Sequence, residues 1–222
     1  MPLKLVIANK AYSSWSFRPW LLLAHFKIPF EEVVVPLDLP TTRKAVLRHS
    51  PSGKVPALTD GDVRVWESLA IAEYVAEKYP AKAIWPKDKA ARAHARAISA
   101  EMHAGFQSLR GQCPMNFRRP VQALALSEAS AADAARIDAI WQGARKNFGG
   151  TSSKGSGEFL FGAFSAADAM FAPVVNRFHI YDVKVSRASR AYMAAMMALP
   201  AWKAWEKDAA AETWRIAKYD AI

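Results

Sequence analysis

The sequence predicts an α/β domain over residues 1–80 followed by an all-helical domain over residues 89–222. Three observations support this division. Short alternating or valine-rich runs, which are typical of strands, occur only before residue 67. Long alanine-rich stretches with helical spacing dominate after residue 88. Between the two, residues 80–88 contain two prolines and no periodicity, which is typical of a linker.

The first elements are a strand, a helix and a second strand. Apolar residues alternate over residues 3–8, which predicts a buried strand. The helix should begin just after Ser13 or Ser14, because Pro19 is tolerated only in the first turn of a helix. Residues 30–37 are rich in valine and predict the second strand.

The rest of this domain is predicted as a short helix, a hairpin and a longer helix. Residues 40–50 favour a short irregular helix. Pro56 then interrupts an apolar strand, although proline lacks the N–H that a central strand needs. A turn over residues 60–62 closes the hairpin, and a helix opens at Glu67. The order β-α-β-α-β-β-α is typical of a thioredoxin-like sandwich.

The second domain is predicted to consist of helices. They are expected over residues 89–111, 128–148, 166–181, 187–198 and 201–210. The glycine- and serine-rich segment from Gly149 to Gly157 predicts a flexible loop. Ser165 and Asp168 have the spacing of a capping box, which we interpret as a structural feature of the helix that follows.

Composition excludes several classes of protein. The formal net charge is +10, but the lysines and arginines are scattered, which argues against nucleic acid and favours attraction of small anions. No apolar run reaches the ~20 residues that cross a bilayer, and no secretory signal is evident. Cys113 is the only cysteine, so we expect no disulfide and a cytoplasmic location. The five histidines lack metal-ligand spacing, so no metal is expected.

Two motifs identify a family resemblance. One is Lys54-Val55-Pro56-Ala57-Leu58 followed by Glu67-Ser68-Leu-Ala-Ile, and the other is Ser13-Ser14-Trp15-Ser16-Phe17-Arg18. Over essentially its whole length the chain resembles the cytosolic glutathione transferases. The second motif is similar to the Ser-Ser-Cys-x-x-Arg start of the zeta class, which includes maleylacetoacetate isomerases. Trp15 stands where that class has its cysteine.

The resemblance implies that the first domain binds glutathione through the start of its first helix. A hydroxyl of Ser13 or Ser14 would donate a hydrogen bond to the glutathione sulfur, and Tyr12 is a third candidate. Helix N-termini lower a thiol pKa because they stabilise the thiolate. The structural alternative for both serines is simple helix capping. Arg18 would serve either in an ion pair or as electrostatic support of the site.

The proline motif and the following helix would hold the rest of the tripeptide. The resemblance implies a cis bond before Pro56 and a backbone pairing of Val55 with the cysteinyl unit. Lys54 would approach the glycyl carboxylate, unless it is an ordinary surface lysine. Glu67 would pair with the γ-glutamyl ammonium, while Ser68 and nearby N–H groups would bind the γ-glutamyl carboxylate. Capping is the structural alternative for both.

The resemblance places a pocket for the second substrate between the domains. Candidate residues are Met102, His103, Phe106, Met115, Asn116 and Arg119. Methionine and aromatic residues at helical spacing are also common in cores. Cys113 is interpreted as a buried small hydrophobe rather than a nucleophile.

The sequence therefore predicts a glutathione transferase that adds the thiolate of glutathione to a small, apolar or aromatic electrophile. The resemblance adds a homodimer and a role in detoxification. Three other functions compete with this prediction. They are a glutathione-dependent cis-trans isomerase of the maleylacetoacetate isomerase kind, a non-catalytic binding protein on the same scaffold, and a nucleic-acid-binding protein. Loss of the zeta-class cysteine at Trp15 argues against the isomerase.

Overall fold

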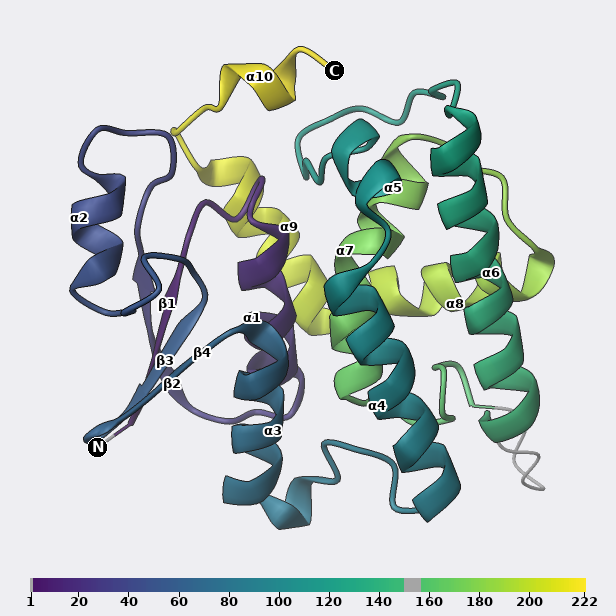
Figure 1. The fold of residues 1–222 in the computed structure, drawn as a ribbon, viewed down its shortest axis with the longest axis horizontal. Helices are drawn as coiled ribbons and strands as arrows, with labels where there is room; N and C mark the ends of the chain where they lie inside the picture. Colours follow the sequence, from purple (N-terminus) through teal and green to yellow (C-terminus); the bar gives the residue numbers. More distant parts are fainter. Residues whose placement is uncertain (1, 150–156) are drawn as a thin grey trace.

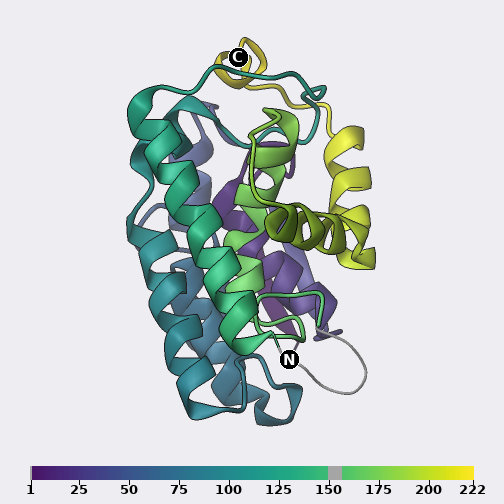
Figure 2. The ribbon, with the colours of Figure 1, turned by 90° about the vertical axis from the view of Figure 1, so that its right-hand side faces the viewer.

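The computed structural model describes residues 2–149 and 157–222. Most of the loop predicted between Gly149 and Gly157 lies outside them. An α/β part with a mixed sheet stands beside a larger helical part (Figure 1). The view turned by 90° shows α4 and α6 running alongside each other on the outside of the helical part (Figure 2). No helix in the described ranges is long and apolar enough to cross a membrane.

The α/β part has the predicted order of elements. They are β1 (Leu3–Ile7), α1 (Ser14–His25), β2 (Phe30–Val34), α2 (Thr42–Leu47), β3 (Ala57–Asp60), β4 (Val63–Trp66) and α3 (Ser68–Lys78). The strands lie in the order β2-β1-β3-β4. β1 pairs in parallel with β2 and antiparallel with β3, and β3 forms a hairpin with β4. Pro56 precedes β3 instead of interrupting it, so no ladder N–H is lost.

The two faces of β1 are covered by different helices. Leu3, Leu5 and Ile7 point to one face, where they join the main core with α1 and α3. Val6 points to the other face and packs with Val46 of α2. This alternation follows from the two-residue period of a strand, and it places α1 and α3 between the sheet and the helical part.

The start of α1 was predicted correctly, but part of the reasoning was wrong. Ser14 is the first helical residue and Ser13 is the N-cap. Pro19 lies inside the helix, beyond its first turn, and Arg18 precedes it. Proline at this position removes one hydrogen bond to the carbonyl of Trp15. The buried face of α1 packs against α7, and this packing keeps the helix continuous across Pro19.

The helical part contains more breaks than the sequence predicted. After a short 3-10 turn at Pro80–Lys82 come α4 (Lys89–Ala104), α5 (Gln107–Gln112), α6 (Glu128–Phe148), α7 (Ala166–Ile180), α8 (Arg187–Ala198), α9 (Pro200–Ala211) and α10 (Ala217–Asp220). The single helix predicted over 89–111 is wrong. It breaks at Gly105 and Phe106, where Phe106 has a positive φ of 59°. A Cβ at position 105 would lie 2.9 Å from the carbonyl oxygen of Glu101.

α7 forms the centre of the helical part. Nearly all of its residues are buried, and it contacts α1, α4 and α8. Its start is the predicted capping box, in which the Asp168 carboxylate accepts hydrogen bonds from the backbone N–H of Ser165 at 2.8 Å and of Leu160 at 3.1 Å. Burial raises the pKa of Asp168 to about 6. The Asp168 carboxylate therefore holds the start of α7 and the segment before it together.

Candidate functional site

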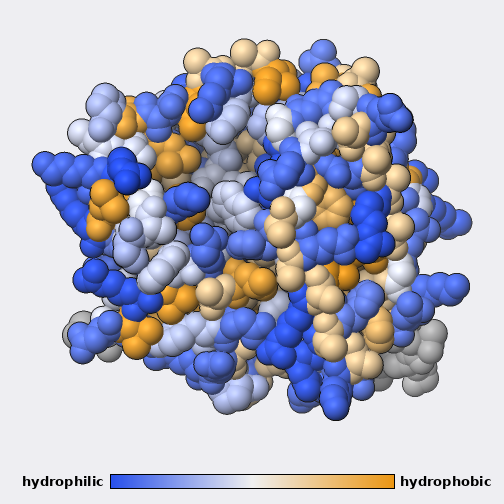
Figure 3. All heavy atoms as spheres, viewed as in Figure 1, coloured by the Kyte–Doolittle hydropathy of each residue, from blue (hydrophilic) through white to orange (hydrophobic). Residues whose placement is uncertain are grey.

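A cavity of about 730 Å³ lies where the α/β part meets the helical part. Its walls come from the start of α1, from α2 and the loop before β3, and from α5, α7 and α10. Figure 3 shows a recess on this face of the molecule. A second cavity of about 370 Å³ shares five lining residues with the first, which are Trp15, Lys54, Val55, Gln107 and Arg110. The two cavities are therefore neighbouring parts of one cleft.

Ser13 and Ser14 both line the larger cavity, but their hydroxyls are placed differently. The buried Ser13 Oγ donates a hydrogen bond to Ser16 Oγ at 2.7 Å. Ser16 Oγ also accepts from the backbone N–H of Ala8 at 3.0 Å. The half-buried Ser14 makes no side-chain hydrogen bond with the described residues. α1 has no acidic residue in its first turn, so no carboxylate there neutralises the partial positive charge at the N-terminus of the helix.

Tyr12 also lines the larger cavity, but its hydroxyl already makes a hydrogen bond to the carboxyl-terminal segment. Tyr12 Oη donates to the carboxylate of Asp220 at 2.9 Å, and Arg118 donates to Tyr12 Oη at 3.3 Å. Asn116 Nδ2 donates to the same carboxylate at 3.1 Å. These contacts hold α10 beside the cavity.

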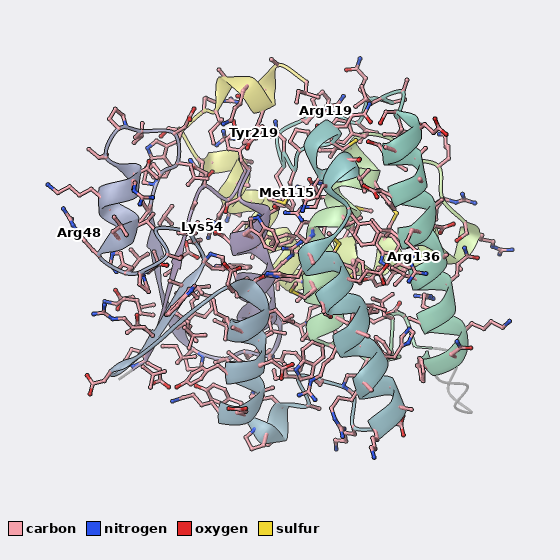
Figure 4. The ribbon with its side chains drawn as sticks, in the orientation of Figure 1. Arg48, Lys54, Met115, Arg119, Arg136 and Tyr219 are labelled. Carbon is pink, nitrogen blue, oxygen red and sulfur yellow. The ribbon has the colours of Figure 1, made fainter. Side chains whose placement is uncertain are left out.

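The loop before β3 presents an unpaired peptide to the cleft. The bond between Val55 and Pro56 is cis, as the resemblance implied. Val55 lines both cavities, and its N–H and C=O make no hydrogen bond with the rest of the described chain. Lys54 lines both cavities as well, and Figure 4 shows it at the edge of the α/β part, towards the helical part. A peptide ligand could therefore pair with Val55 as an added strand.

Glu67 lies in the smaller cavity and has an unusual backbone. Its φ is 69°, in the left-handed region that costs a non-glycine residue energy. One carboxylate oxygen lies 3.4 Å from Nε2 of His103 on α4. Burial, with added repulsion from Arg18 and Arg110, lowers the pKa of His103, so the imidazole is neutral at pH 7. The Glu67 carboxylate, which is about half exposed, thus remains available for a cationic partner.

The side chain of Ser68 does not face either cavity. Ser68 is 1% exposed, and its hydroxyl points to the sulfur of Met170 at 3.8 Å. The Ser68 hydroxyl thus contacts α7 in this structure, and its predicted contact with a ligand carboxylate stays a prediction. Ser68 is the first residue of α3, however, and the first N–H groups of a helix have no partner within it.

Among the six residues predicted for the second pocket, Met115 lines the larger cavity and His103 lines the smaller one. Met102 and Phe106 are buried in the main core. Arg119 donates to the carbonyl oxygens of Pro120, Gln122 and Ile222. In Figure 4 Met115 lies centrally between the two parts, whereas Arg119 lies near the loops above α5. Methionines at helical spacing do not reveal which one faces a cavity.

Arg18, His103 and Cys113 lie in different surroundings. Arg18 is buried and makes no ion pair with a described residue; its Nε donates to the carbonyl oxygen of Met170 at 3.0 Å. His103 lines the smaller cavity. Cys113 is fully buried, and burial raises its thiol pKa to about 11, so it is not a ready nucleophile.

Several cleft residues were not among the predicted pocket residues. Arg110, Arg177, Lys218 and Tyr219 all line the larger cavity. In sequence they look like ordinary helical residues, because only the packing of α5, α7 and α10 turns them towards one space. Across the described chain, no three His, Cys, Asp or Glu side chains group in a way that could hold a metal ion.

Comparison with protein-family models finds two matches. Residues 12–78 match the model described as "Glutathione S-transferase, N-terminal domain". Residues 119–208 match the model described as "Glutathione S-transferase, C-terminal domain". Together the two matches cover more than half of the chain, and they fall on the α/β part and the helical part, respectively.

Curated relatives and solved structures agree with these matches. The chain is 40% identical over 98 residues to a probable maleylacetoacetate isomerase of Caenorhabditis elegans, a match that covers 44% of this chain and 45% of the relative. It is 30% identical over 148 residues to a protein of the same description from Vibrio cholerae, covering 63% and 64%. The chain thus spans less than two thirds of these relatives.

A crystal structure of a glutathione transferase homologue from Burkholderia gl BGR1, with bound glutathione, has a similar fold. The TM-score is 0.72 at 23% identity, and the match covers 96% of this chain and 100% of that one.

Proposed function

This chain belongs to the glutathione S-transferase family, and from that premise we propose that it binds glutathione, stabilises its thiolate and transfers it to a small electrophile. The main support for the proposal is the set of groups that line the cleft. The start of α1, the free peptide groups of Val55 and the carboxylate of Glu67 border one continuous space.

The smaller cavity fits the ends of a zwitterionic tripeptide. Glu67 offers a carboxylate to an ammonium group, and the first N–H groups of α3 offer donors to a carboxylate. Val55 can pair with the central peptide unit, and Lys54 can approach the second carboxylate. Ser68 contributes through its backbone in this arrangement, since its hydroxyl faces Met170.

For the sulfur contact we propose Ser13 first and Ser14 second. The hydroxyl of Ser13 now donates to a neutral oxygen of Ser16. A bond to a charged acceptor is about twice as strong as one to a neutral acceptor, so an arriving thiolate can take over this donor. Ser16 Oγ keeps its bond from Ala8 meanwhile. Ser14 is the competitor, because its hydroxyl is not committed elsewhere in the described chain.

Conjugation then needs no general base at the sulfur. Selective binding of the thiolate makes the anion abundant at neutral pH, and the cleft holds it beside the space for the electrophile. We further propose that the protein acts as a homodimer in the cytoplasm, with a role in detoxification. Gel filtration against standards of known mass tests the dimer.

Glutathione-dependent isomerisation is the second candidate, because two relatives are described as probable maleylacetoacetate isomerases. Trp15, in place of the zeta-class cysteine, argues against it. Turnover of maleylacetoacetate with catalytic amounts of glutathione would favour the isomerase.

The test of the proposal has two steps. The protein should be retained on immobilised glutathione and eluted by free glutathione. It should then conjugate glutathione to a generic aryl halide faster than the uncatalysed reaction. Retention without any turnover would favour a non-catalytic binding protein, and no retention would contradict the proposal.

A further inference from the structure

Trp15 stands where the two cavities of the cleft meet. It lines both of them, whereas Ser13 and Ser14 line only the larger cavity and Glu67 lines only the smaller one. A tripeptide that reaches from Glu67 to the two serines therefore passes Trp15. Trp15 is also the second residue of α1, so the partial positive charge at the N-terminus of this helix lies close to the same place.

Two guanidinium groups lie over the ring of Trp15. The guanidinium carbon of Arg18 is 4.0 Å from the ring centre, and that of Arg110 is 4.7 Å from it. Neither arginine forms an ion pair within the described chain. Cations draw the π-electrons of a ring towards its faces and leave its edge, where the indole N–H lies, more positive. Trp15 therefore presents a polarised N–H in positive surroundings, which favours an anionic acceptor.

The N–H of this indole has no acceptor in the described chain. Nε1 of Trp15 makes no hydrogen bond there, and unlike Nε1 of Trp85 and Trp141 it is not buried. An indole nitrogen can donate a hydrogen bond but cannot accept one. Because Trp15 is half-buried and borders both cavities, its N–H is available to a ligand in the cleft.

We propose that Trp15 is a catalytic residue whose indole N–H donates a hydrogen bond to the sulfur of bound glutathione. The bond is charge-assisted when the sulfur is a thiolate, so it favours the anion over the thiol and adds to the contact proposed for Ser13. The thiol proton goes to solvent, and the indole keeps its own proton throughout. This inference rests on the proposed function and deepens it, because it names a second group that stabilises the thiolate.

The other side chains where the cavities meet suit this contact less well. They belong to Lys54, Val55, Gln107 and Arg110. Lys54 and Val55 are proposed for other parts of glutathione. Gln107 donates through Nε2 to a backbone carbonyl oxygen at 3.2 Å, and Arg110 donates through Nη1 to another at 3.1 Å. The indole N–H of Trp15 is thus left for the sulfur.

The residue type at position 15 fits the same reading. Trp15 stands where the zeta class has its cysteine. A cysteine S–H is a weak donor and its thiolate is a nucleophile, whereas an indole N–H donates more strongly and has no thiolate form. The exchange therefore suits an enzyme that holds the glutathione thiolate for conjugation.

Trp15→Phe tests the contact, because it removes the N–H but keeps a ring on which both guanidinium groups can stack. We expect the pKa of glutathione bound to the full chain to rise by about one unit, a ten-fold change in the ratio of thiolate to thiol. Titration of the thiolate absorbance measures this pKa, and the midpoint of the pH profile of kcat should move with it. The matched control is Trp214→Phe, because Trp214 is exposed and lines neither cavity. A bound pKa in Trp15→Phe equal to that of the wild type would overturn the inference.

The indole N–H also reports on the contact in the unmutated protein, so this second measurement does not depend on the folding of a variant. In a chain with isotope-labelled tryptophan, the Trp15 resonance can be assigned from the spectra of the wild type itself. Saturating glutathione should move its indole proton downfield as the bound thiol ionises. The matched ligand is the glutathione analogue that carries a methyl group in place of the thiol, which should bind without this pH-dependent shift. A Trp15 resonance that responds in the same way to both ligands would contradict the contact.

Together the measurements separate this inference from the proposed function. A lowered bound pKa and a turnover that both survive Trp15→Phe would remove Trp15 from the site but leave the transferase. A bound pKa that depends on Trp15, with no turnover of any aryl halide, would leave the thiolate contact but remove the transferase. Glutathione bound to the wild type with an unshifted pKa would overturn both.

Discussion

Ser13 and Ser14 differ in a way that mutation can resolve. Ser13→Ala removes the hydroxyl that now bonds to Ser16, and Ser14→Ala removes the uncommitted one. We expect Ser13→Ala to lower kcat about 10- to 100-fold while changing glutathione affinity little, because a charged hydrogen bond contributes about 1.5–3 kcal/mol. Steady-state kinetics with calorimetric glutathione titration measures both quantities.

The control for this comparison is Tyr12→Phe. The Tyr12 hydroxyl already bonds to Asp220, so its loss should change kcat by less than about three-fold. A larger loss of kcat in Ser14→Ala than in Ser13→Ala would assign the sulfur contact to Ser14. A large loss in Tyr12→Phe would assign it to the phenol.

Glu67 should determine the affinity for glutathione. Glu67→Gln removes the negative charge in the smaller cavity, and we expect the Kd for glutathione to rise about 10-fold or more. Glu77→Gln is the matched control, because Glu77 lies on α3, the helix that follows Glu67, is exposed and lines neither cavity. An unchanged Kd in Glu67→Gln would remove this carboxylate from the binding site.

Sequence reasoning found some of these residues and could not find others. Ser13, Ser14, Lys54, Val55 and Glu67 stand in short motifs at the ends of elements, and each of them lines the cleft. Arg177 could not be found in this way, because it lies within α7 and belongs to no motif. Only the packing of α7 against its neighbours brings it to the cleft without an acidic partner. Met102 was predicted to line the pocket because of its residue type, but it is fully buried.

At the start of α7, Asp168 makes stability depend on pH. The pKa of its carboxyl is about 6 in the folded chain, against about 3.9 for a free aspartate. The folded state therefore binds the proton more tightly than the unfolded state does. The free energy of unfolding should fall as pH rises from about 4 to about 6 and lose this dependence above that range.

Urea denaturation of the wild type and Asp168→Asn at several pH values measures this effect. The variant should lack the Asp168 part of the slope. It should also be less stable at pH 7 by about 1–3 kcal/mol, because an amide cannot accept all the bonds from Ser165 and Leu160. Other carboxyl groups contribute equally to both proteins. Parallel pH profiles would show that Asp168 does not carry the proton.

Helices with a clear hydrophobic period and a clear capping residue were predicted best. The helix over 128–148 has the predicted ends, because Ser127 caps it and apolar residues recur along one face. The break at Gly105 and Phe106 was missed, because an alanine-rich helix tolerates one glycine by pattern alone. α10 was missed as well; it is short, has no buried residues of its own and is held by contacts with Tyr12 and Asn116.

For the molecule as a whole, the cleft joins two parts that share one core. Residues from β1, α1, α4 and α7 belong to the same buried cluster, so we expect a single cooperative unfolding transition. A ligand that binds only the folded cleft stabilises it by about 2.7 kcal/mol at a hundred times its Kd. For a chain of this length, the midpoint of thermal unfolding should then rise by roughly 5–10 °C.

Calorimetric scans with increasing glutathione measure this shift. Glu67→Gln should need about 10-fold more glutathione for the same shift, while Glu77→Gln should behave as the wild type. An unfolding midpoint that does not respond to glutathione would contradict binding at the cleft.

The central claim is that the cleft prefers the thiolate of glutathione over the thiol, and the pKa of the bound thiol tests it most directly. That pKa can be measured by titrating the ultraviolet absorbance of the thiolate in the complex. We predict a value about two units below the ~8.5 of a free thiol, which corresponds to about 2.7 kcal/mol, and a return towards the free value in Ser13→Ala. A complex in which glutathione is bound with an unshifted pKa would contradict the claim.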